Sequence, residues 1–292
     1  MKLTNNFNLP STIMNVIARP QYNKGKANLS VTELLNSPCI VQLKRKHWDQ
    51  LEEDASSMVW SLFGTALHNI LEHGKGDNHI VEERVFADVE GMRISGAIDL
   101  QEVEADGVIV SDYKTTSAWV VMNEKDDWHN QLNCYAYLLY KAKGVTVKKL
   151  QIVAIVRDWS ARDAKAKESY PQAPIVVIDI PLWSFEKVEQ YVKTRIGLHT
   201  EALFDSDTDE EMAECTQDEM WEKPTRFAVM KKGGVRAKSV HDTEGDADHA
   251  LNQAGKDYFI EIRQGERTRC SNYCQVNQFC SQYQTFLKET NG

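Results

Sequence analysis

The stretch "SGAIDLQEVEADGVIVSDYKTT", residues 95–116, contains two runs rich in Val and Ile, separated by the acidic turn "EADG". Such runs predict two strands that pair antiparallel through the turn. Residues two apart in a strand point to the same face, so Asp112 and Lys114 project together while Tyr113 faces away. The pairing brings Asp99 close to Asp112. The stretch therefore predicts two carboxylates and an ammonium at one place on a sheet.

This group of charges has a catalytic and a structural interpretation. Two buried carboxylates side by side repel each other unless a cation neutralises them. Mg²⁺ takes one or two carboxylates and keeps water and substrate phosphate oxygens at its other positions, and a lysine beside it can orient water or stabilise developing charge. The structural alternative is that Asp112 and Lys114 form a surface ion pair, which is worth about 0–1 kcal/mol.

The surrounding pattern predicts an α/β protein with a mixed sheet. A helix N-cap is expected at Ser30 or Thr32, and apolar residues at helical spacing follow it. In the next helix, Leu62, Ala66, Leu67, Ile70 and Leu71 are expected along one apolar face. The order continues with a strand over 79–89, the two strands of the opening stretch, a helix over 126–144, strands over 148–159 and 173–182, a helix over 183–204 and a hairpin turning at Gly233 and Gly234.

Four short motifs occur in order on these elements. They are "GTALH" (Gly64 to His68), "GAID" (Gly96 to Asp99), "DYK" (Asp112 to Lys114) and "QLNCY" (Gln131 to Tyr135). In this order the chain resembles the PD-(D/E)XK nucleases, and within them the RecB-like and Cas4-like branch. The resemblance implies a restriction-endonuclease-like core with a mixed β-sheet flanked by helices over 28–205, an N-terminal arm over 1–27 and a cysteine-rich C-terminal extension over 206–292.

Carried over residue by residue, the resemblance assigns roles to the motif positions. Asp99, Asp112 and His68 are expected to bind Mg²⁺ or Mn²⁺, with the Tyr113 carbonyl as a further ligand. Lys114 would be the catalytic lysine. Gln131 and Tyr135 would hold the active site or the DNA strand. Outside the motifs, Glu82 and Glu83 in the first strand are further candidates for assisting the metal, whereas His68 and Tyr135 also have ordinary packing interpretations.

Six cysteines occur in the chain, three of them as C-x₃-C-x₅-C at Cys270, Cys274 and Cys280. Three thiolates so close together suit one metal ion or cluster. The resemblance implies a [4Fe–4S] cluster, and its fourth ligand is either Cys215 or Cys39. Zn²⁺ bound by four sulfurs is the chemical alternative, and unligated buried thiols are the structural one. Cys134 is expected in the core.

Composition limits the remaining choices. The net charge of −9 argues against a wholly basic surface but not against a local basic groove. Basic clusters occur at Lys44, Arg45 and Lys46 and at Lys231, Lys232, Arg236 and Lys238, which could contact phosphates or form solvated faces. Trp119, Trp128, Trp159 and Trp221 could stack on bases or pack. No apolar run is long enough for a membrane span, and no secretory signal is evident.

We therefore expect a metal-dependent deoxyribonuclease in the cytoplasm of a bacterium or of a phage-infected host. Exonuclease action on DNA ends or single strands is favoured, in recombination, repair or phage DNA processing, with recombination or replication proteins as further partners. The oligomeric state is left open. The alternatives are a non-catalytic DNA-binding or adaptor protein with a nuclease fold, a nuclease acting on RNA, and an unrelated zinc-stapled protein.

Overall fold

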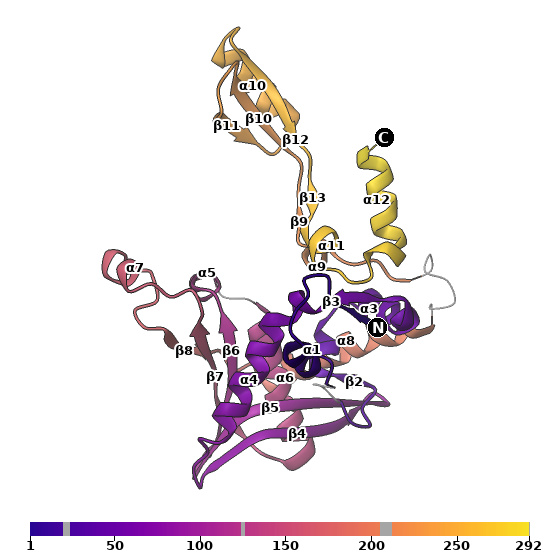
Figure 1. The fold of residues 1–292 in the computed structure, drawn as a ribbon, viewed down its shortest axis with the longest axis vertical. Coiled ribbons are helices and arrows are strands. Elements are labelled where there is room, and N and C mark those ends of the chain that lie inside the picture. Colours follow the sequence, from indigo (N-terminus) through magenta and orange to yellow (C-terminus); the bar gives the residue numbers. More distant parts are fainter. Residues whose placement is uncertain (20–23, 124–125, 205–211, 292) are drawn as a thin grey trace. The chain divides into compact units, whose positions relative to one another are not determined.

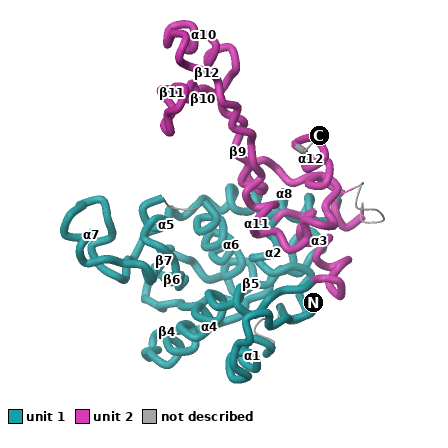
Figure 2. The backbone as a smooth tube through the Cα atoms, turned by 45° about the horizontal axis from the view of Figure 1, so that its top comes forward, with its two compact units in different colours: residues 1–36, 52–201 teal, residues 37–51, 202–292 magenta. Residues whose placement is uncertain are grey.

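The computed structural model describes residues 1–19, 24–123, 126–204 and 212–291. The chain divides into two compact units (Figure 2). The first contains residues 1–36 and 52–201, and the second contains residues 37–51 and 202–292. The predicted boundary between core and extension, at residues 205 and 206, lies outside the described residues. The expected division into arm, core and extension stays a prediction.

A six-stranded mixed sheet forms the first unit, which confirms the predicted fold class (Figure 1). The predicted antiparallel meander is present, because the second strand pairs antiparallel with both of its neighbours. Beyond the meander the pairing is parallel and then antiparallel, and a two-residue strand pairs parallel with the second strand of the meander. The strands are β2 (Leu29–Ser30), β4 (His79–Val89), β5 (Met92–Glu104), β6 (Gly107–Thr116), β7 (Val147–Val156) and β8 (Ile175–Ile180).

The connection between the parallel strands β6 and β7 contains α5 (Ala118–Met122) and α6 (Asp126–Lys143). Acidic residues in the first turn of α6 and lysines in its last turn complement the helix dipole. After the helix, Gly144 takes a φ of 67°, which favours glycine. Apolar residues including Leu132, Leu138 and Leu139 are buried, and the helix contacts β4, β5, β6 and β7. Its burial positions the residues of the fourth motif over the sheet.

The predicted helix after Ser30 is two helices, α2 (Val31–Leu35) and α3 (Pro38–Lys46). Ser30 and Glu33 form a capping box at the start of α2. The helix ends because Pro38 favours an extended residue before it and starts a new helix. From α8 (Phe185–Phe204), Arg195 donates hydrogen bonds to the carbonyls of Leu34 and Asn36, which satisfies the end of α2.

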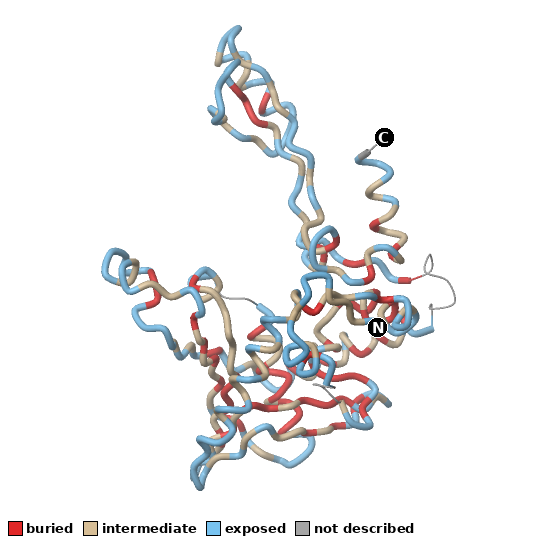
Figure 3. The backbone as a smooth tube through the Cα atoms, viewed as in Figure 1, coloured by how far each residue is buried: buried red, intermediate tan, exposed pale blue. Residues whose placement is uncertain are grey.

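Helix α4 (Val59–Glu72) contains no buried residue, although apolar side chains recur along it (Figure 3). The expected apolar face therefore does not enter the core, and Ile70 is exposed. Trp60 and Phe63 are exposed as well, and Trp60 packs under the guanidinium of Arg157 at 4.2 Å. The remaining short elements of the first unit are β1 (Lys2–Thr4), which pairs with β3 (Glu52–Asp54), α1 (Ser11–Ile17), the 3-10 helix η2 (Ala55–Met58) and α7 (Ala161–Ala166).

In the second unit, residues 222–267 form a segment that we call the arm from here on; it is distinct from the N-terminal arm expected over residues 1–27. A two-stranded stem leads into a three-stranded antiparallel sheet with one helix (Figure 1). The hairpin at Gly233 and Gly234 was predicted, whereas the third strand was not. The arm contains β9 (Glu222–Lys223), β10 (Arg226–Lys231), β11 (Ala237–His241), α10 (Glu244–Ala254), β12 (Tyr258–Arg263) and β13 (Glu266–Arg267); α9 (Gln217–Met220) precedes it, and α11 (Thr268–Asn272) and α12 (Ser281–Asn291) follow. Among the described residues, none of the helices has the length and apolar character that crossing a membrane requires.

Gly96 is required by packing, because a Cβ atom there would lie 2.9 Å from the ring of Tyr135. We expect Gly96→Ala to lower the free energy of unfolding by about 1–3 kcal/mol, measured in urea, since the ring and the strand must separate. Gly64→Ala is the matched control, because nothing lies within 4 Å of the added atom. It should raise stability by about 0.5–1 kcal/mol, since glycine disfavours a helix interior. Equal changes in the two variants would contradict the packing explanation.

Candidate active site

The two aspartates of the second and third motifs lie on neighbouring strands. The β5–β6 ladder pairs Leu100 with Ser111, so the next residues outward are Asp99 and Asp112. Both are buried, at 7% and 2% exposed. The backbone amide of Tyr113 donates a hydrogen bond of 2.8 Å to Asp99 Oδ2. Burial, and then the nearby charge of Asp112, raises the pKa of Asp99 to about 7. Two carboxylates therefore lie together where water does not screen their repulsion, an arrangement that favours binding of a cation.

Lys114 and Gln131 form a closed polar group with Asp112. Lys114 Nζ lies 2.6 Å from Asp112 Oδ2 and donates to Gln131 Oε1 at 3.0 Å. The amide nitrogen of Gln131 donates to Asp112 Oδ1 at 3.2 Å and to the Tyr135 hydroxyl at 2.7 Å. Burial lowers the pKa of Lys114, but Asp112 and Asp99 outweigh that effect and the pKa is raised. The ammonium is thus charged and held in one direction.

His68 projects from α4 toward the same carboxylates. Its Nδ1 atom lies 3.1 Å from Glu82 Oε1 and 3.5 Å from Asp99 Oδ1. The ring meets Tyr113 edge to face, with the ring centroids 6.0 Å apart. The hydrogen bond to Glu82 raises the pKa of His68, against the opposing effect of burial. The structure thus brings the motif histidine to the aspartate pair from a separate helix.

Ligand atoms of His68, Glu82 and Asp99 all lie within 4.8 Å of one another, close enough to hold one ion. Glu82 belongs to none of the four motifs, and it follows from the pairing of β4 with β5 that it stands opposite Asp99. Its φ of 50° is unusual for a non-glycine residue inside a strand. Glu83 has other partners, because it forms an ion pair with Lys143 and accepts a hydrogen bond from Gln101.

The donor set fits a hard divalent cation. Carboxylate oxygens and one imidazole nitrogen suit Mg²⁺ or Mn²⁺, and a cation held there would reduce the repulsion between the charges of Asp99 and Asp112. The Tyr113 amide donates its hydrogen bond to Asp99. That the Tyr113 carbonyl is a ligand of the metal stays a prediction. All of the motif side chains that were expected to act therefore converge on one place in the first unit.

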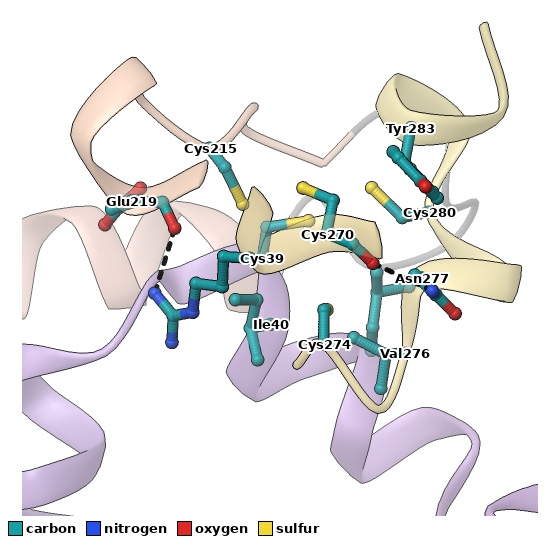
Figure 4. Close-up of a pocket in the computed structure, with 12 residues that line it drawn as sticks. Cys39, Ile40, Cys215, Glu219, Cys270, Cys274, Val276, Asn277, Cys280 and Tyr283 are labelled. Carbon is teal, nitrogen blue, oxygen red and sulfur yellow. Dashed lines mark hydrogen bonds between the residues drawn. The ribbon is translucent and has the colours of Figure 1, made fainter. Parts of the chain in front are cut away.

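A second group of candidate ligands lies in the second unit (Figure 4). Five cysteines line one pocket together with apolar Ile40, Leu43 and Val276: Cys39, Cys215, Cys270, Cys274 and Cys280. All five are free thiols, and all but Cys274 are buried. Both candidates for the fourth ligand are thus at the pocket, and the choice between them stays a prediction. Cys134 is buried within α6 and does not line it.

Soft sulfur donors in an apolar pocket fit an iron–sulfur cluster or Zn²⁺. Burial raises the pKa of Cys270 to about 12, against the effect of the Arg267 guanidinium. Cys280 has the opposite shift, because a hydrogen bond from Cys39 is the main cause that lowers its pKa to about 6. The Ser37 hydroxyl lies 3.1 Å from the Cys215 sulfur. A hydrogen bond thus links two of the five thiols in the pocket.

The other candidates for nucleic-acid contact have mixed surroundings. Trp128 is buried, and the indole of Trp159 donates to the Pro171 carbonyl at 2.7 Å, so both pack. Trp119 and Trp221 are exposed. The first basic cluster, Lys44, Arg45 and Lys46, occupies the last turn of α3, where cations complement the helix dipole. The second basic cluster lies in the arm.

Comparison with known proteins agrees with this geometry. The model of the PD-(D/E)XK nuclease superfamily matches residues 40–281. The chain belongs to that superfamily, and it is accordingly a phosphodiester-hydrolysing, metal-dependent nuclease. No curated protein sequence matches significantly. The solved crystal structure of SSO0001 is similar with a TM-score of 0.45 and 20% identity, over 64% of this chain and 84% of that chain.

The raised pKa of Asp99 predicts a pH dependence of stability in the metal-free protein. The folded state keeps the Asp99 proton up to about pH 7, whereas the unfolded carboxyl releases it near its ordinary value of 3.8. Between these values the folded state binds more protons, so the free energy of unfolding falls as pH rises, by at most about 1.4 kcal/mol per unit. Urea unfolding in chelator from pH 4 to pH 7 measures this.

Asp99→Asn should flatten this fall, because the amide neither titrates nor repels Asp112. Asp88→Asn, which changes an exposed carboxylate on β4, controls for the loss of one negative charge. Saturating Mg²⁺ should remove the fall in the unchanged protein, since the ion favours the charged carboxylates. The interpretation is wrong if Asp99→Asn and Asp88→Asn give the same pH profile.

Proposed function

We propose that this protein is a deoxyribonuclease that uses Mg²⁺ or Mn²⁺ and acts on DNA ends. The observation that carries the proposal is the convergence of Asp99, Asp112, His68 and Lys114 on one place. A binding module has no need of buried, mutually repelling carboxylates beside a charged amine. The alternative of a non-catalytic adaptor is disfavoured for this reason.

Each side chain has a distinct part in the proposed reaction. Asp99, Asp112 and His68 would hold the ion, which when bound would supply Lewis-acid activation of the phosphate and of the attacking water. Lys114 orients that water and stabilises charge on the phosphoryl oxygens. Gln131 fixes the direction of Lys114 through the hydrogen bond to its ammonium, and Tyr135 fixes Gln131. Glu82 positions His68 and is close enough to serve as a ligand.

DNA and exonuclease action are the finer part of the proposal. They are supported by the order of the four motifs and the C-terminal cysteines, which resemble the RecB-like and Cas4-like branch. Such an enzyme would work in recombination, repair or phage DNA processing, in the cytoplasm of a bacterium or infected host. A nuclease acting on RNA is the second candidate, because the site recognises a phosphate ester and no described contact selects the sugar.

The cysteine pocket is proposed to hold a [4Fe–4S] cluster, with Zn²⁺ as the alternative. Its support is the set of five free cysteines on segments far apart in sequence. Cys270, Cys274 and Cys280 would be joined by Cys215 or Cys39. With Cys39 as the fourth ligand, a cluster would tie α3 to residues 270–280 within the second unit, and with Cys215 it would tie the segment before α9 to them.

Lys114→Ala and Asp112→Asn should each lower the rate of DNA cutting at least about 100-fold, because each removes a group needed for charge stabilisation. Cleavage of end-labelled linear DNA in Mg²⁺ or Mn²⁺ measures the rate. Lys149→Ala is the matched control, since Lys149 forms an exposed ion pair with Asp179 on the same sheet. Cutting by Lys114→Ala at the rate of Lys149→Ala would refute the mechanism.

The same assay separates the finer alternatives. An exonuclease degrades linear DNA and leaves covalently closed circles intact, whereas an endonuclease cuts both. RNA of the same sequence, added as a competitor, should leave the rate on DNA unchanged if DNA is the substrate. Faster cutting of the RNA would favour the second candidate.

Cys270→Ser should lower the bound iron and sulfide of anaerobically purified protein, together with its visible absorption, because one ligand is lost. Cys134→Ser, a change within α6, should leave both unchanged. Of Cys39→Ser and Cys215→Ser, the variant that loses the cluster identifies the fourth ligand. Zinc in place of iron in the unchanged protein would reject the cluster and favour the alternative.

A further inference from the structure

The tip of the hairpin between β10 and β11 carries cations that the rest of the arm does not neutralise. Lys231, Lys232, Arg236 and Lys238 fall within eight residues that contain no acid, and all four are exposed. Among the described residues, no ion pair joins any of them to a carboxylate. Like charges this close repel one another, so the tip is a local positive field on a chain of net charge −9.

Elsewhere in the arm, most basic side chains have an acidic partner. Four of its other basic residues form ion pairs within the arm: Lys223 with Glu266, Arg226 with Asp242, Arg263 with Glu261 and Arg267 with Glu222. Lys256, which precedes β12, forms none among the described residues. Acidic residues in the first turn of α10 complement that helix instead of the tip. The cations of the arm that lack an ion pair are therefore the four at the tip and Lys256, whose neighbour Asp257 accepts a backbone hydrogen bond from Lys232.

The shape of the tip is that of a narrow ribbon. Gly233 takes a φ of 76°, and a Cβ atom on Gly234 would lie 3.1 Å from the Lys231 carbonyl, so two residues without side chains make the turn. Val235 beside them is 93% exposed. The backbone amide of Lys232 donates to the Asp257 carbonyl at 2.8 Å, which ties the tip to the start of β12. The ribbon is thus fixed at its base and thin at its end.

We propose that the hairpin tip, residues 231–238, binds the phosphate backbone of duplex DNA. The major groove, about 12 Å wide, admits a two-stranded ribbon, and cations on both strands then face the phosphates on its two sides. The register shift between Val229 and Met230 adds local twist to such a ribbon. The inference rests on the proposed function, because it takes DNA as the substrate, but it concerns binding and not cutting.

The test compares two double variants of the full chain. Lys232→Gln/Arg236→Gln removes two unpaired cations from the tip, and Lys223→Gln/Arg263→Gln removes two paired ones from the same arm. Each double variant removes one lysine and one arginine, so both make the net charge more negative by the same amount. Binding to a fluorescent duplex and to a single strand of equal length is measured by anisotropy in chelator over a range of salt, and thermal unfolding shows that both variants fold.

The tip variant should weaken duplex binding on the order of tenfold at low salt. Its slope of log K against log salt should become shallower by about 1.8, or about 0.9 for each lost phosphate contact. The paired variant should keep the slope of the unchanged protein. The proposal is overturned if the tip variant binds duplex as tightly as the paired variant, and an acidic protein would then be the expected partner of the tip. It is also overturned if the tip variant loses affinity for single strands and keeps its affinity for duplex.

The two proposals fail in different ways. If the unchanged protein cuts DNA and Lys114→Ala does not, while the tip variant binds with the unchanged slope, only the inference about the arm is wrong. If the unchanged protein neither binds nor cuts DNA, the proposed function is wrong and the arm proposal falls with it.

Discussion

The site depends on the repulsion between two carboxylates that the sheet holds side by side. Asp99 and Asp112 are buried on adjacent antiparallel strands, and burial with mutual repulsion raises the pKa of Asp99 to about 7. Neither aspartate can move away without breaking the ladder between β5 and β6. The fold thus maintains an unfavourable arrangement of two charges that a divalent cation bound there would relieve.

Packing explains why the four motifs act together. Gly96 lets the ring of Tyr135 approach the strand, Tyr135 accepts a hydrogen bond from Gln131, and Gln131 contacts both Lys114 and Asp112. A glycine on one strand therefore helps to orient a lysine on the next through a helix. His68 reaches the group from α4, a helix with no buried residue. The lysine side of the site rests on packed elements, whereas the histidine side rests on a helix that the core does not cover.

Local patterning was enough to predict the meander, α6 and the hairpin at Gly233, because alternation, helical spacing and glycine turns are short-range signals. Other features needed information that single residues do not carry. The single helix predicted after Ser30 is two helices, because Pro38 starts a new one. Strand β12 was not predicted, although it pairs with β10. The apolar pattern of α4 predicted a buried face, but no residue of this helix is buried. The sequence offered Glu82 and Glu83 equally as residues that could assist the metal, and only the pairing of β4 with β5 places Glu82 beside His68 and Asp99.

The net charge of the chain does not give the charge of any one part of its surface. A net charge of −9 disfavours a polyanion ligand only if the charges are evenly spread. They are not, because lysines of the first unit, such as Lys143 at the end of α6 and Lys148 and Lys149 on β7, form ion pairs with nearby acids. Four cations at the hairpin tip have no such partner among the described residues. An acidic chain can therefore present a basic surface of a few residues, and the pairing of its cations, more than their number, determines where a phosphate backbone is attracted.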